Sequence, residues 1–161
     1  MGQQGVWLTA AEILARLDVT GVEHLGLGAC STHADDPEPG DRLAGLLRAA
    51  LYRGARSVQA SLWPVRDDAA ALVGAWTWEM LVAGEKNKAR ALRAAVLRLR
   101  NCTGPDAAKE FLRLAQHLPL DDPARSAASI TATYLGKQAR PFSGIHEWAP
   151  FVLHGAPLTA A

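Results

Sequence analysis

Cys30 has the residue type and the setting of a nucleophile. It lies in the segment Gly-Leu-Gly-Ala-Cys-Ser (26–31), after the apolar run 22–28 and before a polar loop. A thiolate is a strong nucleophile, and ligands of open α/β sheets bind beyond the carboxyl ends of the strands, where Cys30 is expected. The backbone amides of Cys30 and Ser31 could together bind an oxyanion. From position alone, a small buried cysteine of the core is an equally good interpretation.

Two other binding motifs overlap this segment, and each lacks a necessary part. Gly26 and Gly28 match two glycines of a dinucleotide-binding loop, but Ser31 replaces the third, and a Pro/Asp loop follows where a helix should begin. Cys30 and His33 have the spacing of half a zinc site, but no second pair of ligands follows. We therefore expect no metal and no other cofactor.

The composition is that of one ordinary globular domain. The chain has 161 residues, 49% hydrophobic and 20% charged, and 17 Lys and Arg against 16 Asp and Glu give a formal charge of +1. This balance produces no global field that would attract nucleic acid or an anionic membrane. The first residues lack the pattern of a signal peptide, and no apolar stretch is long enough to span a bilayer. With two distant cysteines and no disulfide framework, we expect a cytoplasmic protein.

Strand-like and helical segments alternate along the chain. The runs 22–28 and 56–63 are short and largely apolar, which predicts strands buried on both faces. Capping signals and leucine spacing predict helices at about 9–17, 41–51, 67–80, 88–100, 106–117 and 123–138, and a last strand at 148–153. The alternation predicts an α/β fold with a mainly parallel sheet flanked by helices. Because the first confident strand has no obvious N-terminal neighbour, we expect an N-terminally truncated fold.

Two groups of charged residues have ordinary interpretations. Asp67 or Asp68 would cap the helix that follows Pro64. Between residues 86 and 100 the chain is locally basic, without interleaved aromatic residues, so we expect a solvated helix face and no nucleic-acid site. The basic residues are Lys86, Lys88, Arg90, Arg93, Arg98 and Arg100.

Several segments, taken in order, resemble one known domain. They are LTAAEI (8–13), LGLGACST (25–32), GDRLAGLLRAALYRGARSVQASLWPVRDD (40–68), KARALRAA (88–95) and WAPFVLHG (148–155). Together they resemble the CHAT domain, a bacterial relative of caspases and separases, and GARSVQASLWPV is the most specific block. The resemblance is to the C-terminal part of that domain and covers roughly residues 5–100 and 145–155.

The resemblance implies a caspase-like cysteine endopeptidase in which Cys30 matches the nucleophile that forms a thioester with its protein or peptide substrate. Family members activate this thiol with a histidine from a His-Gly motif upstream of LTAAEI. None of the five histidines here matches it. We therefore expect the nucleophile-bearing half of a peptidase, inactive alone, with a further chain or an N-terminal extension supplying the missing part. Asp67 resembles the acid that shapes the P1 pocket of separases, which would favour a basic P1 residue.

These expectations describe a single partial domain over residues 1–161 with a helical insertion at about 103–142. The alternative function is that of an inert pseudo-peptidase remnant, which would bind other proteins through an open strand edge or through the insertion. An unrelated α/β nucleotide binder is a third and weaker alternative.

Overall fold

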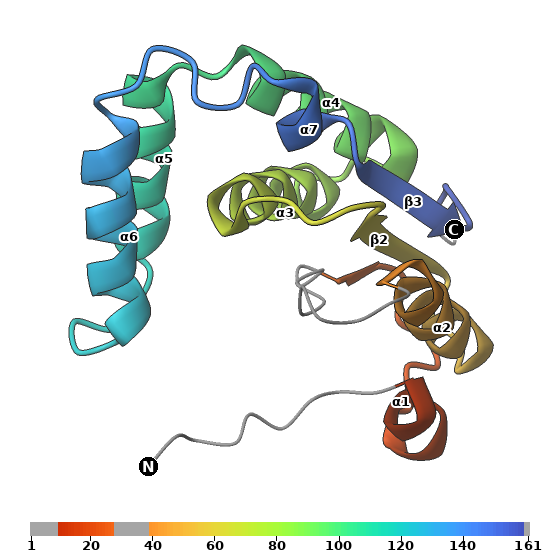
Figure 1. Cartoon of the computed structure of the whole chain (residues 1–161). Helices are drawn as coiled ribbons and strands as arrows, with labels where there is room; N and C mark the ends of the chain where they lie inside the picture. The colour runs from red at the N-terminus through yellow and green to blue at the C-terminus, as the bar shows by residue number, and fades with distance from the viewer. Residues whose placement is uncertain (1–9, 28–38, 160–161) are drawn as a thin grey trace.

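The computed structural model describes residues 10–27 and 39–159 as an α/β arrangement of seven helices and three strands (Figure 1). Along the chain the elements are α1 (Ala10–Arg16), β1 (Leu25–Gly26), α2 (Pro39–Tyr52), β2 (Ser57–Ser61), α3 (Asp67–Val82), α4 (Lys88–Asn101), α5 (Gly104–Ala115), α6 (Pro123–Leu135), α7 (Ile145–Trp148) and β3 (Phe151–Gly155).

The described sheet is mixed, with the strand order β1-β2-β3. β1 runs parallel to β2 and pairs Leu25 with Val58, whereas β3 runs antiparallel to β2 over its whole length, from Ser57 opposite Gly155 to Ser61 opposite Phe151. The expectation of mainly parallel pairing is therefore wrong for the described strands. Alternating strands and helices predict parallel crossovers, but the long route through α5, α6 and α7 brings the chain back in the opposite direction.

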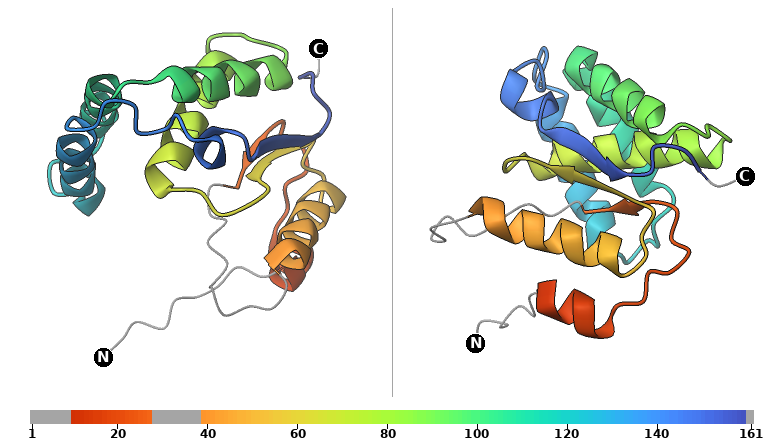
Figure 2. Two further views of the ribbon diagram at one scale, coloured as in Figure 1. Left: turned by 45° about the horizontal axis from the view of Figure 1, so that its top comes forward. Right: turned by 90° about the vertical axis from the view of Figure 1, so that its right-hand side faces the viewer.

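Helices cover both faces of this sheet (Figure 2): α1 and α2 lie on one face, and α3 and α4 on the other. All five residues of β2 are buried, as the sequence predicted. Because side chains alternate along a strand, Val58 and Ala60 pack into the core beneath α2, whereas Ser57, Gln59 and Ser61 face α3 and α4. The face toward α3 is therefore unusually polar for a buried strand.

The ends of the elements differ from expectation in three places. β1 is limited to two residues, although the amide of Leu27 still donates to the carbonyl oxygen of Gln59 at 2.9 Å. α2 begins at Pro39, two residues before the predicted start, and ends at Tyr52, before Gly54, which has φ 105°. The residue before α3 is Arg66, which makes no side-chain capping bond, so neither Asp67 nor Asp68 is the N-cap.

α5 and α6 form an antiparallel hairpin that stands away from the sheet (Figures 1 and 2). Thr103 and Asp122 cap the two helices, as each side chain accepts a hydrogen bond from the first turn. At the hairpin base Gly104 packs tightly against the end of α6, and a Cβ there would lie 2.0 Å from the carbonyl oxygen of Gln138. The two helices predicted at about 106–117 and 123–138 are thus confirmed.

Candidate functional site

A cavity of about 390 Å³ lies at the carboxyl ends of β1 and β2, between these strands and α3. This is the edge of the sheet at which α/β proteins bind ligands. The strands contribute Gly26, Leu27, Gln59, Ala60, Ser61 and Phe151 to its lining, and α3 contributes Asp67, Ala70, Ala71, Gly74 and Trp78.

Small residues on α3 leave room for this cavity. Ala70, Ala71 and Gly74 lie on one side of the helix, and a Cβ built at Gly74 would meet nothing within 4 Å. One turn later Trp78 closes the space. Its Nε1 would lie 3.7 Å from a Cβ at Gly26, so the indole covers the strand at a glycine.

His24 lies beneath Trp78 on the same face of the sheet, and only 4% of it is exposed. The two rings meet edge to face, with centroids 5.2 Å apart and planes at 63°. The Ser57 hydroxyl donates to the Glu23 carbonyl oxygen at 2.8 Å, so at the 3.1 Å contact with Ser57 the Nδ1 of His24 is the donor. Its Nε2 is then unprotonated, and it is buried without a hydrogen bond of normal geometry to any described residue.

The surroundings of His24 favour the neutral ring. Burial lowers the pKa of His24, the Gln59 side chain opposes that shift, and the charge of Lys88 lowers the pKa further. The neutral imidazole packs between Ser57 and Trp78, and so helps to position the indole that lines the cavity.

A buried lysine joins this polar layer to α4. Lys88 is fully buried, and its Nζ donates to the Glu23 carbonyl oxygen at 2.6 Å and to Glu23 Oε2 at 3.1 Å. The same carboxylate pairs with Arg56 at 3.2 Å. Lys88 was expected on a solvated helix face, and this is wrong. Its acceptors belong to Glu23, 65 residues earlier in the sequence, and a run of basic residues cannot reveal them.

Asp67 is exposed and lies on the cavity lining, as the first residue of α3. Its neighbour Asp68 has a different role, since it pairs with Arg66 at 2.5 Å and accepts the amide of Ala69 at 2.8 Å. The capping interpretation of Asp67 is thus wrong, and its assignment to a P1 pocket stays a prediction.

Cys30 and Ser31 lie outside the described residues, as does His33. The described chain reaches Leu27, which lines the cavity, and Cys30 is the third residue after it in the sequence. In the described part of the chain Cys102 is a free cysteine whose thiol is expected to be unreactive. It is buried in the core, and burial raises the pKa of its thiol, as does the charge of Asp106.

Sequence reasoning missed His24, Gln59 and Trp78 as parts of a site. The available signal was the Ser-x-Gln-x-Ser alternation of residues 57–61 in a strand that reads as buried, together with small residues at 70, 71 and 74. Within the described ranges no three His, Cys, Asp or Glu side chains are grouped to hold a metal ion. No helix in these ranges is long and apolar enough to cross a membrane.

Comparison with known proteins agrees with the resemblance seen in the sequence. The chain matches no curated protein and no solved structure. A family model, the CHAT domain, matches residues 2–156, which is nearly the whole chain. The chain therefore belongs to the CHAT domain family.

Proposed function

We propose that this chain carries the nucleophile and the P1 pocket of a caspase-like cysteine endopeptidase. The observation that carries the proposal is the cavity at the carboxyl ends of β1 and β2. Its lining brings together Leu27, three residues before Cys30, and the exposed carboxylate of Asp67. The mixed sheet with helices on both faces, in a chain of the CHAT family, supports the caspase-like arrangement.

The cavity is suited to a long basic side chain. Ala70, Ala71 and Gly74 make a smooth apolar wall for the methylene stem, and Gln59 and Ser61 line its floor. Asp67 would then pair with the guanidinium or ammonium group at the end of the stem. In this proposal Cys30 attacks the scissile bond of a substrate bound in this way.

In the proposed reaction the Cys30 thiolate attacks the scissile carbonyl carbon, and the carbonyl oxygen becomes an oxyanion that the Ser31 amide would help to bind. The carbon–nitrogen bond then breaks, and the leaving amine takes a proton from the activating histidine, which acts as the general acid. Water hydrolyses the thioester and frees the thiol. His24, which contacts the cavity-lining Trp78, is hydrogen-bonded to Ser57. We therefore assign the activating role to a His-Gly segment from another chain or from a longer form of this one.

The test is the alkylation of Cys30 by two peptide electrophiles that differ at P1, one with arginine and one with uncharged citrulline, read by mass spectrometry. Without the activating histidine, we expect neither reagent to alkylate Cys30 faster than it alkylates a free-thiol model compound. Exposed ion pairs contribute about 0.2–1 kcal/mol, so the arginine reagent should react up to about fivefold faster than the citrulline reagent. Asp67→Asn should abolish this preference, and Gly74→Leu, which fills the cavity, should slow both reagents.

The matched control is Asp18→Asn, which removes the charge of an exposed aspartate after α1, keeps the Oδ1 acceptor of the Thr20 amide and should leave the preference unchanged. Equal rates with both reagents, unaffected by Asp67→Asn, would contradict the proposed pocket. Rapid labelling of the chain alone would instead show that it activates its own thiol, and would contradict the need for an external histidine.

A second candidate function is that of a pseudo-peptidase that binds other proteins. The observation that favours it is the projecting α5–α6 hairpin, on which Leu112, Ile130 and Tyr134 are exposed. Equal labelling rates with the two reagents, together with binding of another protein to the hairpin, would favour this candidate.

A further inference from the structure

An apolar stripe runs along the exposed side of α6. It consists of Pro123, Ala127, Ile130 and Tyr134, all exposed, with Ile130 72% and Tyr134 60% exposed. Their spacing places them on one face of the helix. Leu120, 85% exposed in the turn before α6, extends the stripe to the tip of the hairpin. We call these five residues the α6 stripe.

The helix that carries the stripe is itself nearly without charge. Arg125 is the one charged residue in the α6 sequence, and its Nη1 is held by the Leu118 carbonyl oxygen at 2.9 Å. The hydroxyls of Ser129 and Thr133 donate to carbonyl oxygens of their own helix. A helix that faces only water normally carries charged residues on its exposed side, so an uncharged, apolar exposed face indicates contact with another molecule.

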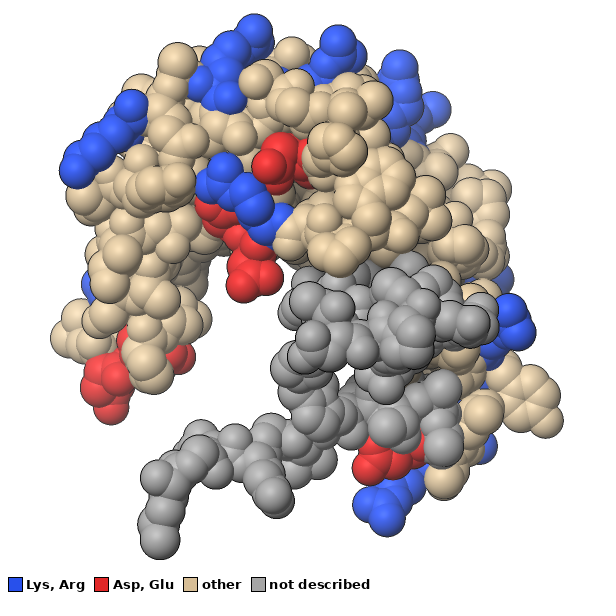
Figure 3. Space-filling view, viewed as in Figure 1, with Lys and Arg blue, Asp and Glu red and all other residues tan. Residues whose placement is uncertain are grey.

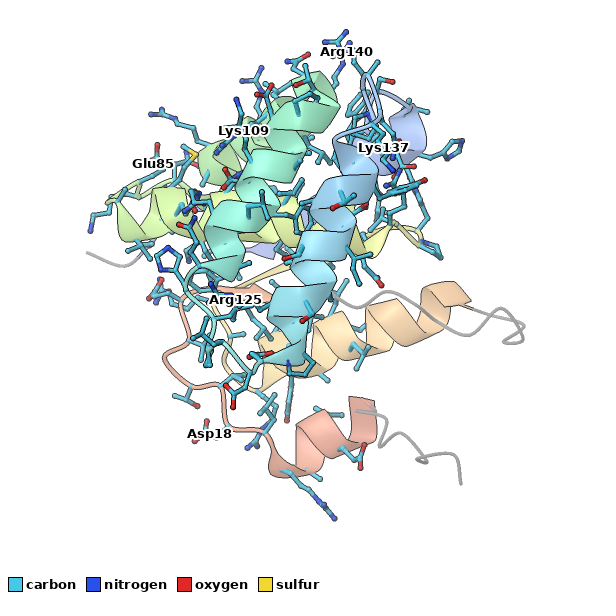
Figure 4. The ribbon with its side chains drawn as sticks, turned by 90° about the vertical axis from the view of Figure 1, so that its left-hand side faces the viewer. Asp18, Glu85, Lys109, Arg125, Lys137 and Arg140 are labelled. Atoms are coloured by element: carbon cyan, nitrogen blue, oxygen red, sulfur yellow. The ribbon has the colours of Figure 1, made fainter. Side chains whose placement is uncertain are left out.

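One end of the stripe lies near the N-terminal end of α3. The Arg66 guanidinium is 6.0 Å from the centre of the Tyr134 ring, and Arg66 directly precedes Asp67 on the cavity lining. The stripe therefore leads from the N-terminal end of α3, whose first residue lines the cavity, to the hairpin tip. In Figure 4 the hairpin stands in front of α3 and the sheet, and the labelled Lys109, Lys137 and Arg140 lie toward its base, away from the tip.

Acidic groups mark both ends of this path. Asp67 lies at the cavity and Asp121 at the hairpin tip; both are exposed, and neither forms an ion pair with any residue that the structure describes. Figure 3 shows acidic side chains both at the free end of the hairpin and above the hollow between the hairpin and the sheet. The surface complementary to this pattern is an apolar segment with a basic residue at each end.

The length of α6 sets the spacing of those basic residues. Its 13 residues span about 20 Å at 1.5 Å per residue. An extended peptide advances about 3.3 Å per residue, so about six residues cover the same distance. Asp121 precedes α6 by two residues and Asp67 lies on α3, so a basic residue in the cavity and a second one at least about six positions away would each meet an aspartate.

We propose that the α6 stripe binds the segment of a protein substrate that adjoins the cleavage site, through about six extended, mainly apolar residues that end in a second basic residue. This proposal rests on the proposed peptidase function, because the bound segment is taken to be part of the substrate.

Fluorescence anisotropy on the full chain tests the proposal with labelled peptides. A short peptide contains a single arginine for the cavity, and two long ones add five apolar residues and a second arginine, on the N-terminal or the C-terminal side. One long peptide should bind at least about tenfold more tightly than the short one, because burying an apolar side chain of this size is worth more than 1.4 kcal/mol. Ile130→Glu should remove that gain, whereas Ile145→Glu, at an isoleucine that is 60% exposed on α7, should retain it. Asp121→Asn should weaken only the long peptide, by up to about fivefold.

Equal binding of short and long peptides, or a gain that Ile130→Glu leaves intact, would overturn the proposal. A dimer that Ile130→Glu converts to a monomer, without any change in peptide binding, would show that a second copy covers the stripe and would also overturn it. The Cys30 labelling test reports separately on the peptidase function. If labelling shows no preference for arginine while the long peptide keeps its gain, the docking surface stands and the peptidase function fails.

Discussion

Acidification below pH 6.5 is expected to destabilise this protein through the side chain of His24. In the unfolded chain the pKa of a histidine is about 6.5, and in the folded protein burial lowers the pKa of His24. Between the two pKa values the unfolded state binds more protons, so stability rises with pH there. The contribution of His24 is complete above pH 6.5 and is lost as the pH falls toward the folded-state pKa.

The structure limits the size of the effect. His24 is 4% exposed, and burial and the ammonium group of Lys88 both oppose its protonation, so the folded protein is expected to bind this proton less readily than the unfolded chain. Each unit then costs at most about 1.4 kcal/mol of the free energy of unfolding. For a chain of 161 residues the fall in Tm per pH unit below 6.5 is therefore at most about 3–5 °C.

Urea denaturation at pH 7.5 and pH 5.5 measures this difference. His24→Gln retains a donor for the Ser57 hydroxyl and cannot be protonated, so its stability should vary less between the two pH values, by up to about 1.4 kcal/mol. His117→Gln, at an exposed histidine, is the matched control and should behave as the original chain. An equal pH dependence in the original chain and in His24→Gln would refute the assignment.

Two further predictions concern stability and can be checked by chemical denaturation. Lys88→Met should lower the free energy of unfolding by about 1.5–3 kcal/mol, because it removes two hydrogen bonds of a buried ammonium group to Glu23. Arg56→Met, at the half-exposed partner of the same carboxylate, should cost less than about 1 kcal/mol, and equal losses would contradict the importance of burial. Gly104→Ala should cost at least about 2 kcal/mol, since its Cβ would lie 2.0 Å from one carbonyl oxygen and 2.3 Å from another. Gly144→Ala, where a Cβ meets nothing within 4 Å, should change stability by less than about 0.5 kcal/mol, and a comparable loss there would count against the steric argument.

Local signals in the sequence were sufficient for most helices. Thr103 and Asp122 cap helices close to the starts that the sequence predicted at about 106 and 123. The direction of β3 was not predictable in the same way, because the side-chain pattern of a five-residue strand is the same for either direction of pairing.

The sequence predicted the location of the site, because that location follows from where a strand ends along the chain. The end of β1 indicated where a ligand would bind, and the cavity is found there. The contact of His24 with Trp78 and the bond of Lys88 to Glu23 join segments more than 50 residues apart. Such contacts arise from packing, and no spacing rule within one segment records them. The roles of Cys30 and Ser31 stay predictions.

The close fit of Gly104 against the end of α6 makes the two ends of the hairpin unequal for protein engineering. At its base, α5 and α6 meet backbone to backbone, and the amide of Gly104 donates to the Ala139 carbonyl oxygen at 3.2 Å. The tip is an exposed turn around Leu120 and Asp121. A fluorescent tag or a foreign loop inserted at residue 120 should therefore be accommodated, whereas any lengthening at residue 104 would separate the two helices.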